Sequence, residues 1–338
     1  MTESNGPSSD ILVDIYRRMA LIRENDDKIH QSALSGRMNV IYYSPRGQEA
    51  IASSIAAHLR DDDYVTTIYR GIQDQLAKGV PPKVLWAEYA GRATGSCKGK
   101  GGPMHITYPE KGVMVTTGIV GSSMPIANGL ALASQINGED RVTVANFGDG
   151  ASNIGAFHEA LNLAAVWNLP VIFVCQNNRY AEHSKFEAYT AGGNVAKRSQ
   201  SYDMPGIRVD GNDPVAVWKA AGEAVARARA GGGPTLIEAM TFRFKGHLMG
   251  DEGHYIPKEE MAAALAADPV PGFRARLIAE GHATEGQLSA IEQAIAAEVA
   301  EAERLALESP WPDLSELEKD VLGDGKPART HIDMELIA

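Results

Sequence analysis

The sequence has little cysteine and no long hydrophobic run. Only two of its 338 residues are cysteines, Cys97 and Cys175, which is typical of a reduced intracellular protein and excludes a disulfide scaffold. No apolar segment approaches the roughly 20 residues that a helix needs to cross a bilayer. Residues 1–10 lack the basic start and apolar stretch of a signal peptide. These absences predict a cytoplasmic protein without membrane contact, in which Cys175 is a buried thiol.

Basic residues are also in deficit. The chain has 32 lysines and arginines against 43 aspartates and glutamates, a net charge of −11, so a role in binding nucleic acid has no electrostatic support. The hydrophobic fraction of 44% and the charged fraction of 22% are those of an ordinary globular protein. The length suffices for one large α/β domain or two small ones. Glycine, in contrast, is abundant, with 34 residues.

Two strand–helix–strand units make up the centre of the chain. The helices between the strands have the length of crossovers that join parallel strands, and the run 171–175 is typical of a strand buried on both faces. The predicted elements are a strand at 141–147, a helix at 157–167, a strand at 171–175, a strand at 206–211, a helix at 214–229 and a strand at 235–244.

Helices are predicted at both ends, over 11–34, over 49–59 and from 258 onward, whereas the glycine-crowded segment 91–121 is interpreted as loops. There is no internal repeat and no long linker. The simplest interpretation is one α/β domain over residues 11–325, with a mostly parallel sheet flanked by helices and with helical extensions at both ends. Residues 1–10 and 326–338 are then flexible tails.

Polar loops follow two consecutive strands of this predicted sheet. Gly148-Asp149-Gly150 comes after the first strand and Asn177-Asn178 after the second, and ligands of open parallel sheets bind at these carboxyl ends. A helix beginning near Asn153 would direct its free N–H groups to the same region, which favours phosphate. One carboxylate, one amide oxygen and one loop carbonyl suit Mg²⁺, which also takes waters and substrate phosphates. The pattern therefore predicts a Mg²⁺–diphosphate site.

Either loop alone is an ordinary turn, but the pair on consecutive strands weakens that interpretation. The sequence matches neither of two other phosphate-binding motifs. A dinucleotide fingerprint needs a third glycine earlier than Gly155. The segment nearest to a P-loop, residues 95–101, has the wrong spacing and no hydroxyl after its lysine.

Gly148-Asp149-Gly150 followed by Asn177-Asn178 resembles the thiamine-diphosphate-binding motif. Neighbouring segments narrow the resemblance to the α subunit of the first component of 2-oxo acid dehydrogenase complexes, a family that serves pyruvate, branched-chain 2-oxo acid and acetoin dehydrogenases. The resemblance extends from about Ile11 to about Leu322 in one register, and it implies a thiamine-diphosphate-binding fold. The segments that carry it are 67–70, 98–105, 118–121 and 243–247.

The resemblance implies roles for particular residues. Mg²⁺ would be held by Asp149, Asn178 and the backbone carbonyl of Tyr180. The residues that would contact the diphosphate are Tyr69 and Arg70 through their side chains and Gly150 and Ala151 through their N–H groups.

The remaining implied residues lie toward the reacting end of the cofactor. Gly118 and Val120 would reach the aminopyrimidine ring through backbone groups, and His247 would act near the thiazolium as an acid/base or orienting group. Arg243 is interpreted as structural and His254 as structural or exposed. His105 stands at a family position to which we assign no role.

Several residues depart from the pyruvate and branched-chain pattern. Leu248 follows His247 where those enzymes have a serine, which is phosphorylated in animal forms, so that regulation is not expected. The segments 247–251 and 148–153 are more similar to acetoin dehydrogenase. Tyr43 replaces a histidine of the substrate pocket, and Arg179 replaces a frequent glycine; both changes leave the substrate open.

The resemblance also implies partners. The glutamate that activates the cofactor lies in a pyrimidine-holding domain, and this chain has strand–helix units for one sheet only, so a separate β subunit and an α2β2 assembly are expected. The acyl product would pass to a lipoyl-bearing acyltransferase. The expected function is cleavage of acetoin or a related small-molecule ketone. Oxidative decarboxylation of pyruvate or a branched-chain 2-oxo acid is the alternative, and a non-catalytic regulatory module that keeps the fold is a third hypothesis of another class.

Overall fold

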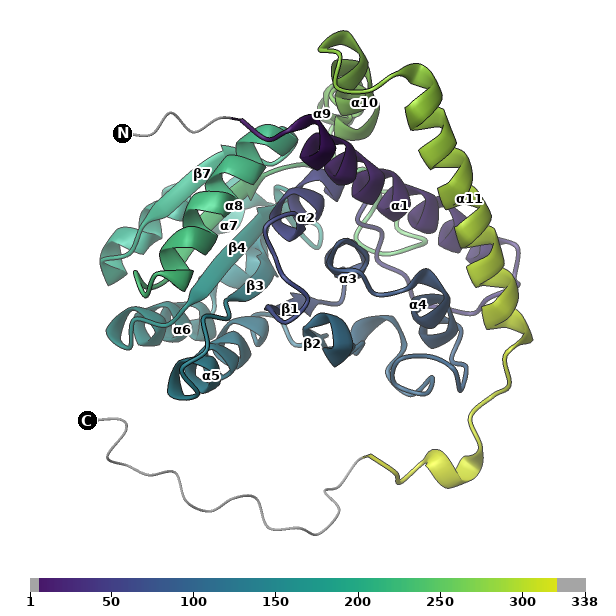
Figure 1. Cartoon of the computed structure of the whole chain (residues 1–338), viewed down its shortest axis with the longest axis horizontal. Coiled ribbons are helices and arrows are strands. Elements are labelled where there is room, and N and C mark those ends of the chain that lie inside the picture. The colour runs from purple at the N-terminus through teal and green to yellow at the C-terminus, as the bar shows by residue number, and fades with distance from the viewer. Residues whose placement is uncertain (1–5, 321–338) are drawn as a thin grey trace.

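A computed structural model describes residues 6–320 of the chain. Its main sheet has six strands, all parallel, in the order β2-β1-β3-β4-β8-β7 (Figure 1). A short antiparallel hairpin, β5 and β6, follows β4. The prediction of an α/β fold with a mostly parallel sheet is confirmed. The strands are β1 (Tyr64–Ile68), β2 (Val113–Thr117), β3 (Thr143–Gly148), β4 (Val171–Asn177), β5 (Tyr180–Ala181), β6 (Ser184–Lys185), β7 (Gly206–Asp210) and β8 (Thr235–Met240).

Helices cover both faces of the sheet, and the strand residues alternate between them. Val144, Ile172 and Val174 pack against α2 and α8, whereas Phe147 and Phe173 pack against α5 and α6. Because both faces are apolar, β4 is a continuous hydrophobic run, as the sequence predicted, and Cys175 is buried in it. The covering helices are α2 (Glu49–Ala56), α5 (Ser123–Ile136), α6 (Gly155–Val166) and α8 (Pro214–Arg229).

Two long helices from opposite ends of the described chain lie side by side, α1 (Ser9–Leu34) and α11 (Glu285–Glu308) (Figure 1). Tyr16 of α1 donates a hydrogen bond to Glu292 of α11. Lys28 and Arg37 form ion pairs with Glu303 at 3.4 and 3.0 Å. The remaining α-helices are α3 (Ile72–Lys78), α4 (Pro82–Tyr89), α7 (Phe186–Tyr189), α9 (Lys258–Ala266) and α10 (Pro269–Ala279).

The observed boundaries follow local chemistry. The helix α8 spans 214–229 as predicted, since Asp213 accepts hydrogen bonds from Val215 N and Ala216 N at its start. The interpretation of 91–121 as loops was wrong at Val113–Thr117, which form β2 beside β1. None of the helices in residues 6–320 has the length and apolarity needed to cross a bilayer. The prediction of a flexible tail over residues 1–10 was wrong at Ser9 and Asp10, which belong to α1. Residues 1–5 of that tail and the predicted tail 326–338 lie outside the described residues.

The glycine-rich segment before β2 folds around a buried carboxylate, that of Glu88 in α4. Its two oxygens accept hydrogen bonds of 2.8–3.0 Å from the backbone N–H groups of Cys97, Gly99, Gly101 and Gly102. A Cβ at Gly95 would lie 2.4 Å from Glu88 Oε2. Glycine is therefore required by the close approach of the backbone to this side chain.

Glu88→Gln is expected to lower the free energy of unfolding by about 2 kcal/mol, because an amide nitrogen cannot accept a hydrogen bond and part-buried N–H groups then lose their charged acceptor. Urea unfolding monitored by circular dichroism measures the change. The matched control is Glu110→Gln, which alters an exposed glutamate and should stay within about 0.5 kcal/mol of the parent. Equal stability of the two variants would contradict this account of the loop.

Candidate active site

Five of the six parallel strands end at one pocket of about 420 Å³. Arg70 follows β1, Gly118 follows β2, Asp149 follows β3, Asn178 follows β4 and His247 lies beyond β8. The chain order reverses at β1, which has β2 on one side and β3 on the other. Open α/β sheets bind ligands outside the carboxyl ends of the strands at such a switch point.

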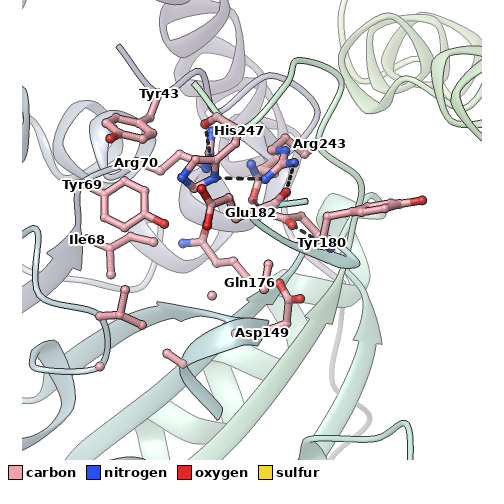
Figure 2. Close-up of a pocket in the computed structure, with 18 of the residues that line it drawn as sticks. Tyr43, Ile68, Tyr69, Arg70, Asp149, Gln176, Tyr180, Glu182, Arg243 and His247 are labelled. Carbon is pink, nitrogen blue, oxygen red and sulfur yellow. Dashed lines mark hydrogen bonds between the residues drawn. The ribbon is translucent and has the colours of Figure 1, made fainter. Parts of the chain in front are cut away.

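All the site residues predicted from the sequence line this pocket, and Figure 2 shows several of them converging on it. Tyr43 also lines it, whereas Arg179 is exposed and borders a separate hollow. Tyr43 and Arg179 are the two departures from the family pattern that leave the substrate open. Only Tyr43 therefore faces the pocket. The predicted residues in the lining are Tyr69, Arg70, Gly118, Val120, Asp149, Gly150, Ala151, Asn178, Tyr180 and His247.

The predicted metal ligands come together at the ends of β3 and β4. Asp149 is buried and accepts a hydrogen bond from Tyr189, and burial raises the pKa of its carboxyl. Asn178 Oδ1 lies 3.2 Å from the Tyr180 N–H, which donates to it. The Tyr180 ring points away from the pocket toward Glu260, 3.2 Å from its hydroxyl (Figure 2). This leaves an oxygen-only donor set of carboxylate, amide and carbonyl, which fits Mg²⁺.

The backbone after β3 leaves room for a ligand. Residues 149–153 form a 3-10 helix and α6 begins at Gly155, two residues after Asn153, near which the sequence predicted its start. A Cβ added at Gly148 would meet nothing within 4 Å, so open pocket lies beside it. A Cβ at Gly150 would lie 2.8 Å from Ala181 Cβ, so glycine permits close packing against the β5–β6 hairpin.

Two buried arginines border the pocket without a carboxylate partner among the described residues. Arg70 is 4% exposed and donates to Ser44 O and His247 O at 2.7 and 2.8 Å. Arg243 is 1% exposed and donates to Glu182 O at 2.8 Å, while its Nε has no partner in the described chain. Burial and the neighbouring Arg243 lower the pKa of Arg70 to about 10.

Buried charges are costly unless they are paired, so these two guanidinium groups fit a polyanionic ligand such as a diphosphate. The interpretation of Arg243 as structural, made from the sequence, overlooked its position beside the pocket. The only available signal was its place in the Arg-Phe-Lys-Gly-His segment, because residue type alone does not reveal the absence of a partner.

The ring of His247 is half-buried and lies edge-to-face against Tyr43 and Tyr69, with centroid distances of 5.4 and 6.0 Å. Its backbone N–H donates to Asp251 Oδ2 at 2.6 Å. Burial, followed by the charges of Arg70 and Arg243, lowers the pKa of His247 to about 4. The imidazole is therefore neutral near pH 7 and able to accept a proton.

This lowered pKa makes the stability of the chain without ligand depend on pH. The ordinary pKa of histidine is 6.5, and that of His247 in the fold is about 4. Between these values the unfolded chain binds more protons, so the free energy of unfolding decreases as the pH falls from 6.5 toward 4. We expect His247→Gln to flatten that decrease, measured by urea unfolding at stepped pH. Identical slopes in both proteins would contradict the assignment.

A hydrogen-bonded network beneath the pocket was not predicted. Buried Asp74 accepts hydrogen bonds from Thr67 and from Gln176 Nε2, the latter at 2.9 Å. Gln176 Oε1 in turn accepts from Gln73 Nε2 at 2.8 Å. Since the carboxylate fixes the Gln176 amide, it also fixes that of Gln73, whose buried Oε1 has no donor in the described chain. The sequence gives no signal for this network, because its residues come from three separate segments.

The parallel sheet, the oxygen donors and the paired arginines define an α/β enzyme with an anion-binding pocket at the carboxyl edge of its sheet. Residues 16–315 match the family model described as dehydrogenase E1 component. The chain belongs to this family, which confirms the resemblance found in the sequence and implies thiamine diphosphate as the cofactor.

Named relatives cover nearly the whole chain. The α subunit of acetoin:2,6-dichlorophenolindophenol oxidoreductase from Bacillus subtilis is 44% identical over 91% of this chain and 92% of that protein. The subunit of the same name from Cupriavidus necator is 40% identical over 92% and 93%. The pyruvate dehydrogenase E1 component α subunit from Rhizobium meliloti is 39% identical over 91% and 88%.

Proposed function

We propose that this chain is the α subunit of a thiamine-diphosphate-dependent dehydrogenase that cleaves acetoin or a related ketone. The observation that carries the proposal is the pair of buried arginines, Arg70 and Arg243, beside the Asp149 and Asn178 oxygens on one pocket. Two relatives with acetoin in their names share at least 40% of their aligned residues with it. Since a pyruvate dehydrogenase α subunit is 39% identical, a 2-oxo acid is the alternative substrate.

In this proposal Asp149, Asn178 and the Tyr180 carbonyl hold Mg²⁺. Arg70 and Arg243 balance the charge of the diphosphate. When bound, thiamine diphosphate supplies the electron sink for cleavage of the bond next to a carbonyl.

Further contacts to the diphosphate come from the Tyr69 hydroxyl and from the N–H groups of Gly150 and Ala151. Backbone groups of Gly118 and Val120 contact the aminopyrimidine. Neutral His247 accepts or returns a proton at a substrate oxygen, since its ring borders the same pocket.

The proposal includes a β subunit that covers the pocket and supplies the glutamate that activates the cofactor, in an α2β2 assembly located in the cytoplasm. Its support is that two adjacent apolar residues beside the pocket, Ile119 and Val120, are 71% and 49% exposed. Exposed apolar surface is typical of a site that a partner protein covers. The named relatives are also α subunits. A lipoyl-bearing acyltransferase would then take up the acyl group.

The test is reconstitution of the chain with its β subunit, thiamine diphosphate and Mg²⁺, followed by reduction of a dye by a panel of substrates. Acetoin should be oxidised fastest, and omission of Mg²⁺ or β should remove the activity. Preference for pyruvate or a branched-chain 2-oxo acid would establish the alternative. Cofactor binding without any turnover would favour a regulatory module.

A further inference from the structure

Glu182 is an exposed residue whose side chain borders the pocket. It lies in the turn between β5 and β6 and lines the same cavity as His247. Figure 2 shows its side chain between His247 and Gln176, and its charge acts to raise the pKa of His247, against the two arginines. Within residues 6–320 the Glu182 carboxylate has no ion pair and no hydrogen bond; only its backbone oxygen is bonded, to Arg243.

The backbone holds Glu182 in an unusual conformation. Its φ is +49°, a region that residues other than glycine rarely adopt. The hydrogen bond from Arg243 Nη2 to its carbonyl, at 2.8 Å, and the pairing of Ala181 with Ser184 fix the turn. Strain of this kind persists where the surroundings enforce it, and it concentrates at functional sites.

Two further groups that face the pocket can accept hydrogen bonds, whereas the buried amide nitrogen of Gln48 is a donor without a partner in the described chain. Gln73 Oε1 is buried without a donor, and His247 is neutral near pH 7 because its pKa is lowered to about 4. The only permanent cations among the described lining residues are Arg70 and Arg243. On the proposed function, on which this step rests, both are engaged by the diphosphate and by backbone carbonyls. The substrate therefore meets the negative charge of Glu182 with no further permanent cation among the described lining residues.

We propose that Glu182 determines the class of substrate: it favours uncharged 2-hydroxyketones, whose hydroxyl group donates to these acceptors, and it disfavours 2-oxo acids. The carboxylate of a 2-oxo acid would lie in the same pocket as that of Glu182, with no unpaired cation to receive it. Like charges placed close together in a binding site reduce affinity strongly. Glu182 acts here on substrate choice and takes no part in proton transfer.

The experiment compares Glu182→Gln with the parent in the reconstituted α/β holoenzyme, with acetoin and pyruvate as substrates and a dye as acceptor. The ratio of kcat/KM for pyruvate to that for acetoin should rise about tenfold or more, mainly through a lower KM for pyruvate. Glu182→Gly, which suits a positive φ, should shift the ratio in the same direction. The matched control is Glu187→Gln, which removes an exposed charge outside the pocket and should leave the ratio unchanged.

An unchanged ratio in both Glu182 variants would overturn the proposal, and so would an equal fall in kcat for both substrates, since that indicates a role in the chemistry. Calorimetric measurement of thiamine diphosphate binding to the parent holoenzyme distinguishes failure of the Glu182 proposal from failure of the proposed function. Failure of binding and of acetoin oxidation in the parent would overturn the proposed function itself. Turnover by the parent with an unmoved ratio would overturn only the assignment of Glu182.

Discussion

Replacing Asp149 with asparagine is expected to weaken Mg²⁺-dependent binding of thiamine diphosphate by at least about 100-fold, because loss of a side chain that only orients a metal ligand already costs about 10- to 100-fold. The chain without ligand should be at least as stable as the parent. Burial raises the pKa of the Asp149 carboxyl, so an ionised carboxylate there opposes folding at neutral pH. The amide keeps an oxygen for the hydrogen bond from Tyr189.

Titration calorimetry with and without Mg²⁺ measures the affinity, and urea unfolding measures the stability. The matched control is Asp210→Asn, because Asp210 ends β7 at the same edge of the sheet, is exposed and does not line the pocket. That variant should bind like the parent. If Asp149→Asn bound the cofactor with unchanged Mg²⁺ dependence, the carboxylate would not be a metal ligand.

His247→Gln is expected to lower kcat by about 100- to 10,000-fold, the usual contribution of a positioned acid or base. Affinity for the cofactor should change little, because residue 247 holds its loop through backbone groups that any side chain retains. These are the N–H that donates to Asp251 and the carbonyl that accepts from Arg70, at 2.6 and 2.8 Å. Steady-state kinetics of the α/β holoenzyme, together with calorimetry, separates the two effects.

The control for this variant is His254→Gln, since the His254 side chain is 86% exposed, in agreement with its interpretation from the sequence, and lies outside the pocket. Its kcat should equal that of the parent. A kcat of the His247 variant within about threefold of the parent would remove the acid/base role, given the magnitude that such a role carries.

Position after a buried strand predicted Asp149 and Asn178 from the sequence, whereas the family resemblance implied the other residues of the site. Asp149 and Asn178 each come after an apolar run, and parallel strands bring such positions to one edge. The strand Val113–Thr117 was missed because it is short and enclosed by glycines at 112 and 118. Its partner strand is β1, which lies far from it in the sequence, and a local residue pattern cannot show that two distant strands pair.

Other features depend on neighbours that no local pattern specifies. Arg243 matters because no carboxylate of the described chain pairs with it, and Glu182 matters because it borders the cavity from a turn in which its φ is positive. Both are properties of tertiary packing. Glu88 is similar: the glycines of its loop were evident, but the carboxylate around which they fold lies in the preceding helix.

The pairing of α1 with α11 has a consequence for synthesis of the chain. The first helix is complete at Leu34, whereas its partner begins only at Glu285. Until then the apolar face that carries Ile15 and Met19 lacks the α10 and α11 side chains that bury it. The nascent chain therefore leaves the ribosome with an incompletely covered amphipathic helix for most of its translation, a state in which chains aggregate or engage chaperones.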